Sequence, residues 1–361
     1  MAIAASGAVS FADLRSEFVG GSSAISFSDL YRGGSNIRAK AANNNGVNLA
    51  ANVPTSGAID VSSFRNQAKG FRYTFTAGAT DQNASALFGS DYSVNYPKEI
   101  VIDSGVELGA TSTAEEALEI DSGGAGTITV TNNGTLSGAG GAAGADGGDA
   151  FEAAVACTFV NNGTVRAGGG GGGTGGTGGN GYYTTNTNYS FSGSPNCGGT
   201  NSFTGWYAGA AFSGAKIKIN GTQVASAAYA SATATSGYYR STYRGNFTED
   251  GGVCGYKYDF YSQSTTNTSG GSGGAGAVGA GYSQSAGTGS AGSSGGTNAG
   301  SGGSGGNGGA FGSAGSTGAT GANGNSSNGS AGSAGGAAGK YLRGLSFVTF
   351  TNNGTALGGT A

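Results

Sequence analysis

Short runs of alternating apolar and polar residues recur along this chain, and they predict a protein built mainly of β-strands. Residues 73–76 and 99–102 show this period of two, and residues 106–108 and 127–130 follow. The dipeptide Tyr96-Pro97 marks a turn before the second run. The alternation favours a β-domain with very little α-helix.

One alternating motif that runs into Asn-Gly occurs four times. The copies are residues 128–136, 158–165 and 347–355 and the shorter 216–222. Asn and Gly both tolerate positive φ, so each strand is expected to end in a tight turn. We expect the copies to be successive rungs of one β layer or solenoid. Between the rungs the chain leaves on long excursions, which are residues 137–149, 166–214 and 223–343.

These excursions hold nearly all of the glycine blocks, and in places glycine recurs at every third residue. The clearest run is Gly312, Gly315, Gly318, Gly321 and Gly324, resuming at Gly329, Gly332 and Gly335. Three residues per turn is the period of a polyproline II-type helix, and collagen is excluded because the chain has only three prolines. The pattern predicts polyglycine II helices that hydrogen-bond to one another. The alternative is a flexible Gly/Ser linker, which the interleaved strand motifs disfavour.

A different short repeat occupies the N-terminal part of the chain. The copies are residues 8–15, 24–32 and 58–65, each a strand-like pair followed by Ser or Asp, which can cap a helical turn. Segments this small bury little surface by themselves. We therefore expect an attachment arm that folds against a partner, with a small independent domain as the alternative.

Aromatic residues gather in residues 182–261, which hold eleven tyrosines and the only tryptophan, Trp206. Ser, Thr, Asn and Gly fill the gaps between them. This is the composition of an antibody paratope, in which rigid rings supply contact area and small polar residues supply hydrogen bonds. Rings also stack on sugar faces. Alternatively, some of these tyrosines plug the ends of the glycine-rich lattice.

Several kinds of chemistry are excluded or disfavoured by the composition. The chain has no histidine, which removes the commonest general base and imidazole metal ligands. The carboxylates Glu115, Glu116, Glu119 and Asp121 are better interpreted as a solvated acidic face than as a glycosidase pair. We predict no enzyme, no cofactor and no metal site. The chain shows no basic footprint for nucleic acid and no apolar run of about 18 residues for membrane insertion.

The three cysteines divide into two kinds of position. Cys157 lies in an alternating apolar run and is expected to be a buried free thiol. Cys197 and Cys254 flank the aromatic region and could form a disulfide, although the odd number of cysteines leaves this open.

Two parts of the sequence resemble proteins of tailed bacteriophages. Residues 26–34, with Val53-Pro54 and residues 56–59, resemble a leader of virion structural proteins common in marine and cyanobacterial phages. The glycine-rich body with its tyrosine segments resembles the tip adhesins of phage long tail fibres. That resemblance implies an N-terminal part that attaches to the fibre, a sandwich of polyglycine II helices, and distal loops that bind the host receptor. The Asn-Gly-Thr rungs and the acidic segment depart from this pattern and suggest a β scaffold that carries the sandwich.

The resemblance therefore implies a receptor-binding adhesin of the virion, made in the host cytoplasm and acting outside the cell. Its receptor would be a surface polysaccharide or an outer-membrane protein. The alternative is a head or tail decoration fibre without receptor binding. The other partners would be tail or fibre proteins, and a homo-oligomer is compatible with the sequence. The fold class is mainly β and irregular, a β-solenoid or sandwich-like scaffold with packed polyglycine II helices.

The implied domains and residues are as follows. The domains are an attachment arm at 1–72, a β-domain at 73–165, a glycine-rich body at 166–343 and a closing strand at 344–361. The docking residues are Phe11, Leu14, Arg15, Phe27, Leu30, Tyr31, Arg32 and Phe64. The receptor-binding residues are Tyr182, Tyr183, Tyr189, Phe191, Phe203, Trp206, Tyr207, Tyr238, Tyr239, Tyr243, Tyr256, Tyr258 and Tyr261.

Overall fold

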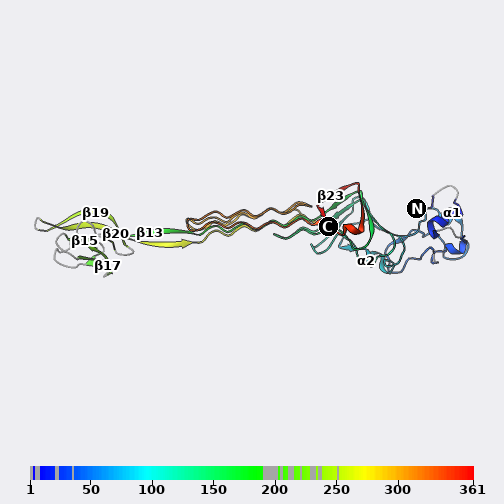
Figure 1. Cartoon of the computed structure of the whole chain (residues 1–361), viewed down its shortest axis with the longest axis horizontal. Helices are drawn as coiled ribbons and strands as arrows, with labels where there is room; N and C mark the ends of the chain where they lie inside the picture. The colour runs from blue at the N-terminus through cyan, green and yellow to red at the C-terminus, as the bar shows by residue number, and fades with distance from the viewer. Residues whose placement is uncertain are drawn as a thin grey trace.

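The computed structural model describes residues 3–361 except for 5–8, 21–23 and 35. Between residues 190 and 251 it describes only the backbone of the strands, and the side chains of residues 187–262 lie outside the description. Figure 1 shows a long, narrow molecule with an N-terminal unit at one end and a stack of strands beside it. A thin shaft extends from this stack, and the strands β13 and β20 leave the far end of the shaft.

The N-terminal unit, residues 3–68, consists of short helical turns joined by loops. Its elements are α1 (Phe11–Leu14), the π-helical turn η1 (Arg15–Val19), η2 (Phe27–Leu30), β1 (Val47–Asn48) and η3 (Val61–Phe64). Ser10 and Asp13 form a capping box at α1, in which the Ser10 N–H donates to the Asp13 carboxylate at 2.7 Å. Ser26 and Asp29 repeat this box at η2, so both caps follow from the repeat in the sequence.

This unit has a hydrophobic core of its own. Leu14, Leu30 and Phe64 occupy the same position in the three sequence repeats, and all three side chains are fully buried. They pack with Phe18 and Ile37 in a single cluster. The expectation that the segment must fold against a partner to bury its apolar residues was therefore wrong. The repeats converge on one another instead.

The strand stack consists of three sheets in which neighbouring strands run parallel, except that β1 pairs antiparallel with β2. The first sheet contains β2 (Phe71–Phe75), β5 (Lys98–Ile102), β8 (Ile128–Asn132), β11 (Cys157–Asn161) and β22 (Val348–Asn352). The second contains β3 (Ala79–Thr80), β6 (Glu107–Gly109), β9 (Thr135–Ser137), β12 (Thr164–Arg166) and β23 (Thr355–Leu357). The third contains β4 (Gln82–Asn83), β7 (Leu118–Ile120) and β10 (Phe151–Ala153). The chain visits the three sheets in turn and then starts the next layer.

This region contains five further elements. They are α2 (Ala84–Phe88), η4 (Gly89–Asp91), β21 (Lys340–Leu342), η5 (Leu345–Phe347) and β24 (Gly359–Thr360), which pairs with β21. The strands bury alternate residues, so that Ile100, Val130 and Phe159 follow one another in register inside the stack.

Three of the four Asn-Gly copies lie in neighbouring strands of the first sheet, β8, β11 and β22. Their asparagines form a ladder, in which the Asn132 amide donates to the Asn161 Oδ1 at 2.8 Å and the Asn161 amide to Asn352 at 2.7 Å. The prediction that the fourth copy is also a rung was wrong. It forms β16 (Ala215–Ile219), which pairs antiparallel with β17 (Thr222–Ala227) as a hairpin.

The shaft is built from the glycine-rich segments, which lie side by side and are neither helices nor strands. They are residues 138–148, 167–180, 269–281, 286–296, 299–311, 312–324 and 327–339. Successive N–H groups of the central segment, 167–180, donate to three different neighbours. The N–H of Gly171 donates to Ala145, that of Gly172 to Ala277 and that of Gly173 to Ser316, at 2.7–2.9 Å. This rotation through three directions explains why the pattern has a period of three.

The glycines of the period-three run are the points of contact between segments. A Cβ atom at Gly315 would lie 2.1 Å from the carbonyl oxygen of Gly171, and one at Gly318 2.1 Å from that of Thr174. At the edge of the shaft, serine hydroxyls take the place of neighbouring carbonyls. The N–H of Thr174 donates to the Ser333 Oγ at 2.7 Å. Backbone donors at the edge are thereby satisfied as well.

An arginine fixes the root of the shaft, where the chain rejoins the stack after β21. The Arg343 guanidinium contacts Asp149 at 2.8 Å, Glu152 at 3.1 Å and Glu116 at 3.5 Å. Burial, together with the hydrogen bond and negative charge of Glu152, raises the pKa of Glu116 to about 7. The interpretation of Glu116 as part of a solvated acidic face was therefore wrong, because its side chain is only 10% exposed.

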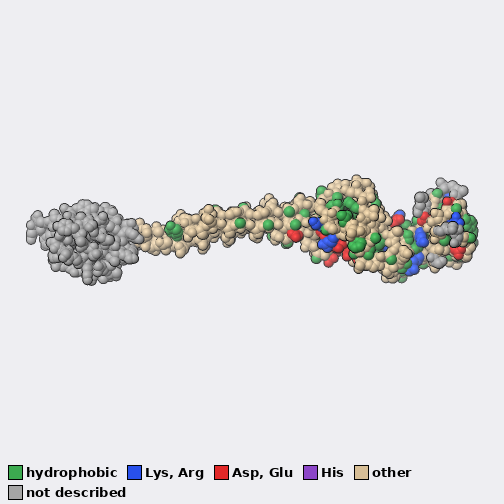
Figure 2. Space-filling model, in the orientation of Figure 1, with side chains coloured by type: hydrophobic (Ala, Val, Ile, Leu, Met, Phe, Trp, Pro, Cys, Tyr) green, Lys and Arg blue, Asp and Glu red, His purple; other side chains and the backbone are tan. Residues whose placement is uncertain are grey.

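The fold class is mainly β and irregular, with little helix. Among the described helices, none is long and apolar enough to cross a membrane. Figure 2 shows charged side chains gathered over the stack and the N-terminal unit, while the visible face of the shaft is almost free of them.

Candidate functional site

The end of the shaft farthest from the N-terminal unit carries a two-stranded ribbon. Strand β13 (Gly181–Tyr189) continues the central segment of the shaft, and β20 (Gly252–Thr268) runs back into the next one. The two strands pair antiparallel, with Tyr182 opposite Asn267 and Tyr183 opposite Thr266. Tyr182 and Tyr183 thus lie on opposite faces of the ribbon, 40% and 36% exposed.

Further strands join β20 beyond the ribbon. Strands β15 (Trp206–Gly209) and β19 (Tyr238–Glu249) both pair with β20. A second sheet contains β14 (Ser202–Phe203), β16, β17 and β18 (Thr233–Ala234). The register brings Trp206 and Tyr243 opposite Tyr258 on β20. Three of the predicted receptor-binding residues therefore occupy paired positions on three neighbouring strands.

The other predicted residues of this region cannot be placed further. The side chains of the receptor-binding set from Tyr189 to Tyr261 lie outside the described residues, as does Phe191 entirely. Cys197 and the side chain of Cys254 also lie outside, so their disulfide remains a prediction. Cys157 is described, and it is a buried free thiol as predicted. Burial raises the pKa of this thiol to about 11, which keeps it protonated and unreactive at neutral pH.

Two asparagines from separate turns of the shaft hold the backbone of Tyr182 at the base of the ribbon. The side-chain amides of Asn298 and Asn325 each donate to the Tyr182 carbonyl at 3.0 Å. The Asn325 Oδ1 in turn accepts the N–H of Tyr182 at 2.8 Å. On the other strand, the Thr268 hydroxyl donates to the carbonyl of Thr297 at 2.7 Å. The base of the ribbon is thus fixed to the shaft on both strands.

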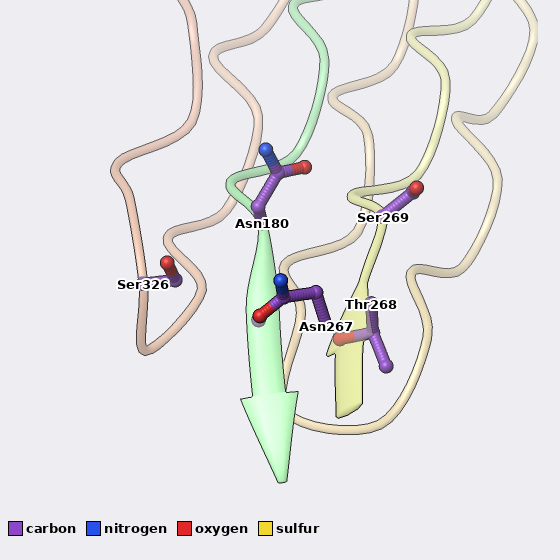
Figure 3. A pocket seen from close by; sticks show the side chains of 6 residues that line it. Asn180, Asn267, Thr268, Ser269 and Ser326 are labelled. Carbon is purple, nitrogen blue, oxygen red and sulfur yellow. The ribbon is translucent and has the colours of Figure 1, made fainter. Parts of the chain in front are cut away.

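A polar cleft of about 260 Å³ opens beside this junction. Its lining residues are Asn180, Gly181, Asn267, Thr268, Ser269 and Ser326. Figure 3 shows Asn180 just before β13, Asn267 and Thr268 at the end of β20, Ser326 on a neighbouring turn and Ser269 on the returning segment. These residues are not among the predicted site residues. One feature of the sequence marks this junction: the dipeptide Asn180-Gly181 comes directly after the longest glycine block.

The predicted docking residues lie at the opposite end of the molecule and fall into two groups. Leu14, Leu30 and Phe64 are buried in the core of the N-terminal unit, so they are not available to a partner in this structure. Phe11 is 47% exposed and contacts the Phe27 ring at a centroid distance of 4.8 Å. The other three residues are half-buried: Arg15, Tyr31 and Arg32.

No group of three or more metal-ligating side chains occurs among the residues that the structure describes. The only carboxylate cluster with a strongly raised pKa is the one that binds Arg343 at the root of the shaft, within the described part of the chain. An ion-paired arginine occupies that cluster, which gives it a structural role.

A long body with an aromatic ribbon at one end defines a binding protein of the fibrous type. The family model for the phage tail fibre adhesin Gp38 matches residues 70–258, just over half of the chain. The chain belongs to this family of phage tail fibre adhesins, which are receptor-binding proteins of the virion. The crystal structure of the gp37–gp38 adhesin tip complex of the bacteriophage S16 long tail fibre is similar at 17% sequence identity. That match covers 85% of this chain and 88% of the other, with a TM-score of 0.36.

A search of curated proteins gives no match. Family membership confirms the resemblance to phage tail fibre adhesins drawn from the sequence, and with it the virion location and the absence of an enzymatic function. It favours the adhesin over the alternative of a decoration fibre without receptor binding.

Proposed function

We propose that this adhesin is attached to its fibre through the N-terminal unit and contacts the host receptor with the strands beyond the shaft. The observation that carries the proposal is the position of these two regions at opposite ends of the long axis (Figure 1). An adhesin needs one surface for the virion and another for the cell, and the shaft separates them. The receptor is a surface polysaccharide or an outer-membrane protein.

We infer that the strand stack is a β-solenoid and that the shaft is a sandwich-like block of polyglycine II helices. The supporting features are parallel strands in three sheets and a rotation of backbone hydrogen bonds through three directions. The domains we propose are the attachment arm 1–72, the β-domain 73–165, the glycine-rich body 166–343 and the closing strand 344–361. On this division, the closing strand completes the last layer of the β-domain.

The receptor-binding surface consists, in this proposal, of the aromatic residues on the strands beyond the shaft. Its test replaces Tyr238, Tyr239 and Tyr243 together by alanine in the full chain. Adsorption of the purified protein to host cells should be lost, while the thermal unfolding of the shaft stays unchanged. A matched triple replacement by phenylalanine keeps the rings and should retain most of the adsorption. Unchanged adsorption of the alanine variant would contradict the proposal.

The fibre-binding surface consists, in this proposal, of the exposed part of the N-terminal unit around Phe11. Phe11→Ala removes an exposed ring and should weaken attachment of the purified protein to particles made without it. Leu14→Ala serves as a contrast, because it opens a cavity in the core and should lower the unfolding temperature. If Phe11→Ala protein attaches as well as the wild type, the docking surface lies elsewhere.

A further inference from the structure

We propose that the polar cleft at the junction of shaft and ribbon is a subsite for one residue of a neutral polysaccharide. This inference rests on the proposed function and names the receptor chemistry for one part of the distal end. The cleft has a volume of about 260 Å³. Pockets that bind drug-sized ligands have volumes of roughly 300–1,000 Å³, so this smaller cleft suits a single sugar ring. The side chains around it are amides and hydroxyls.

Polar groups of the cleft are left open for a ligand. Among the described residues, none hydrogen-bonds to the side chains of Asn267, Ser269 or Ser326, and all three are exposed. By contrast, the Asn180 Oδ1 accepts the N–H of Gly270 at 3.2 Å, which orients its amide group. An amide offers both donors and an acceptor, and a hydroxyl offers one donor and two lone pairs. Sugar hydroxyl groups need this mixture of donors and acceptors.

An aromatic residue, Tyr182, follows the cleft residue Gly181 on the ribbon. Tyr182 pairs with Asn267 across the two strands, so both side chains lie on the same face of the ribbon. The ring is 40% exposed, and the two asparagines of the shaft turns hold its backbone in place. Because the backbone at Tyr182 is held before binding, stacking a sugar face on its ring loses less conformational entropy than stacking on a residue of a free loop would.

The charge of the surrounding chain selects a neutral ligand. Residues 167–186 and 263–339 contain no Asp, Glu, Lys or Arg, and the chain has no His. These residues supply every group that lines the cleft. An anionic sugar or a phosphate would lose water here without gaining a cationic partner, which is unfavourable. A neutral hexose presents only hydroxyl and C–H groups, so it needs no charged partner.

The test measures binding of the full chain to immobilised neutral hexose oligosaccharides and to matching oligosaccharides that contain uronic acids. The wild type should bind the neutral series, with little change between low and high salt. Asn267→Ala should weaken this binding about tenfold, since one side-chain amide is removed. Tyr182→Ala should weaken it similarly. Thr266→Ala is the matched control, because it changes the neighbouring residue on the opposite face and should have no effect.

The inference is overturned if the neutral series does not bind, if the uronic acid series binds better, or if Asn267→Ala binds as the wild type does. Adsorption to host cells separates this result from the proposed function. If the glycan test gives one of these results but the wild type adsorbs and the Tyr238/Tyr239/Tyr243 alanine variant does not, only the glycan subsite fails. The adhesin proposal then stands. If the wild type does not adsorb at all, the proposed function itself fails. Equal unfolding temperatures of the variants exclude misfolding as the cause.

Discussion

A single methyl group inside the shaft should be enough to disrupt it, and Gly303→Ala tests this. Gly303 is buried, its N–H donates to the carbonyl of Gly176 at 2.8 Å, and its own carbonyl accepts the N–H of Gly274 at 2.9 Å. A Cβ atom built at this position would lie 2.1 Å from the carbonyl oxygen of Ala319. Gly303 therefore contacts three other segments at once, and no flexible side chain is available to give way.

The expected loss of stability follows from how far the neighbouring segment must move. An ordinary contact of this kind is at least 3.4 Å, so segment 312–324 must shift by about 1 Å. That segment is bonded to segment 299–311 through the N–H groups of Ser316, Ala319 and Ala322, each at 2.8 Å. Overpacking costs about 1–3 kcal/mol, and each weakened hydrogen bond adds about 1 kcal/mol. We expect a loss of about 4–6 kcal/mol, a large share of the roughly 5–15 kcal/mol of a typical protein.

The assay is calorimetric unfolding of the full chain combined with amide exchange over residues 299–324. Ser304→Thr is the matched control, because it also adds one methyl group but at an exposed position on the same segment. The control should change the stability by less than about 0.5 kcal/mol. Equal unfolding temperatures and equal exchange for the two variants would refute the argument that glycine is required by contact between segments.

Three further predictions concern the edge of the shaft, the stack and the root. Ser333→Ala removes the acceptor of the Thr174 N–H and should reduce the free energy of unfolding by about 1 kcal/mol in chemical denaturation; an unchanged midpoint would contradict this. Asn161→Ala interrupts the buried amide ladder and should cost about 2 kcal/mol or more by the same measurement, and a neutral result would show that the ladder contributes nothing. Because the pKa of Glu116 is raised from 4.5 to about 7, its contribution to stability is fully present below about pH 4.5 and is lost as the pH rises through about 7. The unfolding temperature of the wild type should therefore fall as the pH rises from 5 to 8, and Glu116→Gln should remove this fall. If the variant keeps the same pH dependence, another group causes it.

The sequence predicted best those features that depend on a local period. Glycine at every third residue marked the contacts of segment 312–324, and the Asn-Gly motif marked three strands that stack in register. Both patterns repeat because each copy makes an equivalent contact with an equivalent position on the neighbouring segment or strand. The fourth copy, residues 216–222, shows the limit of this reasoning. The same residues also suit a hairpin, and only the pairing partner decides between the two.

Features that depend on distant residues could not be predicted from these patterns. Arg343 meets Glu116 across more than half of the chain, and no local signal relates the two. Each N-terminal repeat is too small to form a core alone, and the pattern within one copy does not show which other copies it packs against. Leu14, Leu30 and Phe64 are buried by one another, so the core depends on all three copies together. The distal cleft likewise combines a strand end, a returning segment and a separate turn.

The number of neighbours around each segment explains how much glycine that segment contains. Segment 167–180 has neighbours in three directions and is mostly glycine, with Thr174 and Thr177 at exposed positions, whereas segment 312–324 has glycine mainly at every third position. These contacts are between backbone groups, so outward positions whose side chains make no hydrogen bond can change freely. The ribbon meets the shaft only at its base, through Tyr182 and Thr268 among the described residues. Substitutions farther along the ribbon therefore leave the shaft contacts intact, and an adhesin built in this way can acquire a new receptor surface without losing its support.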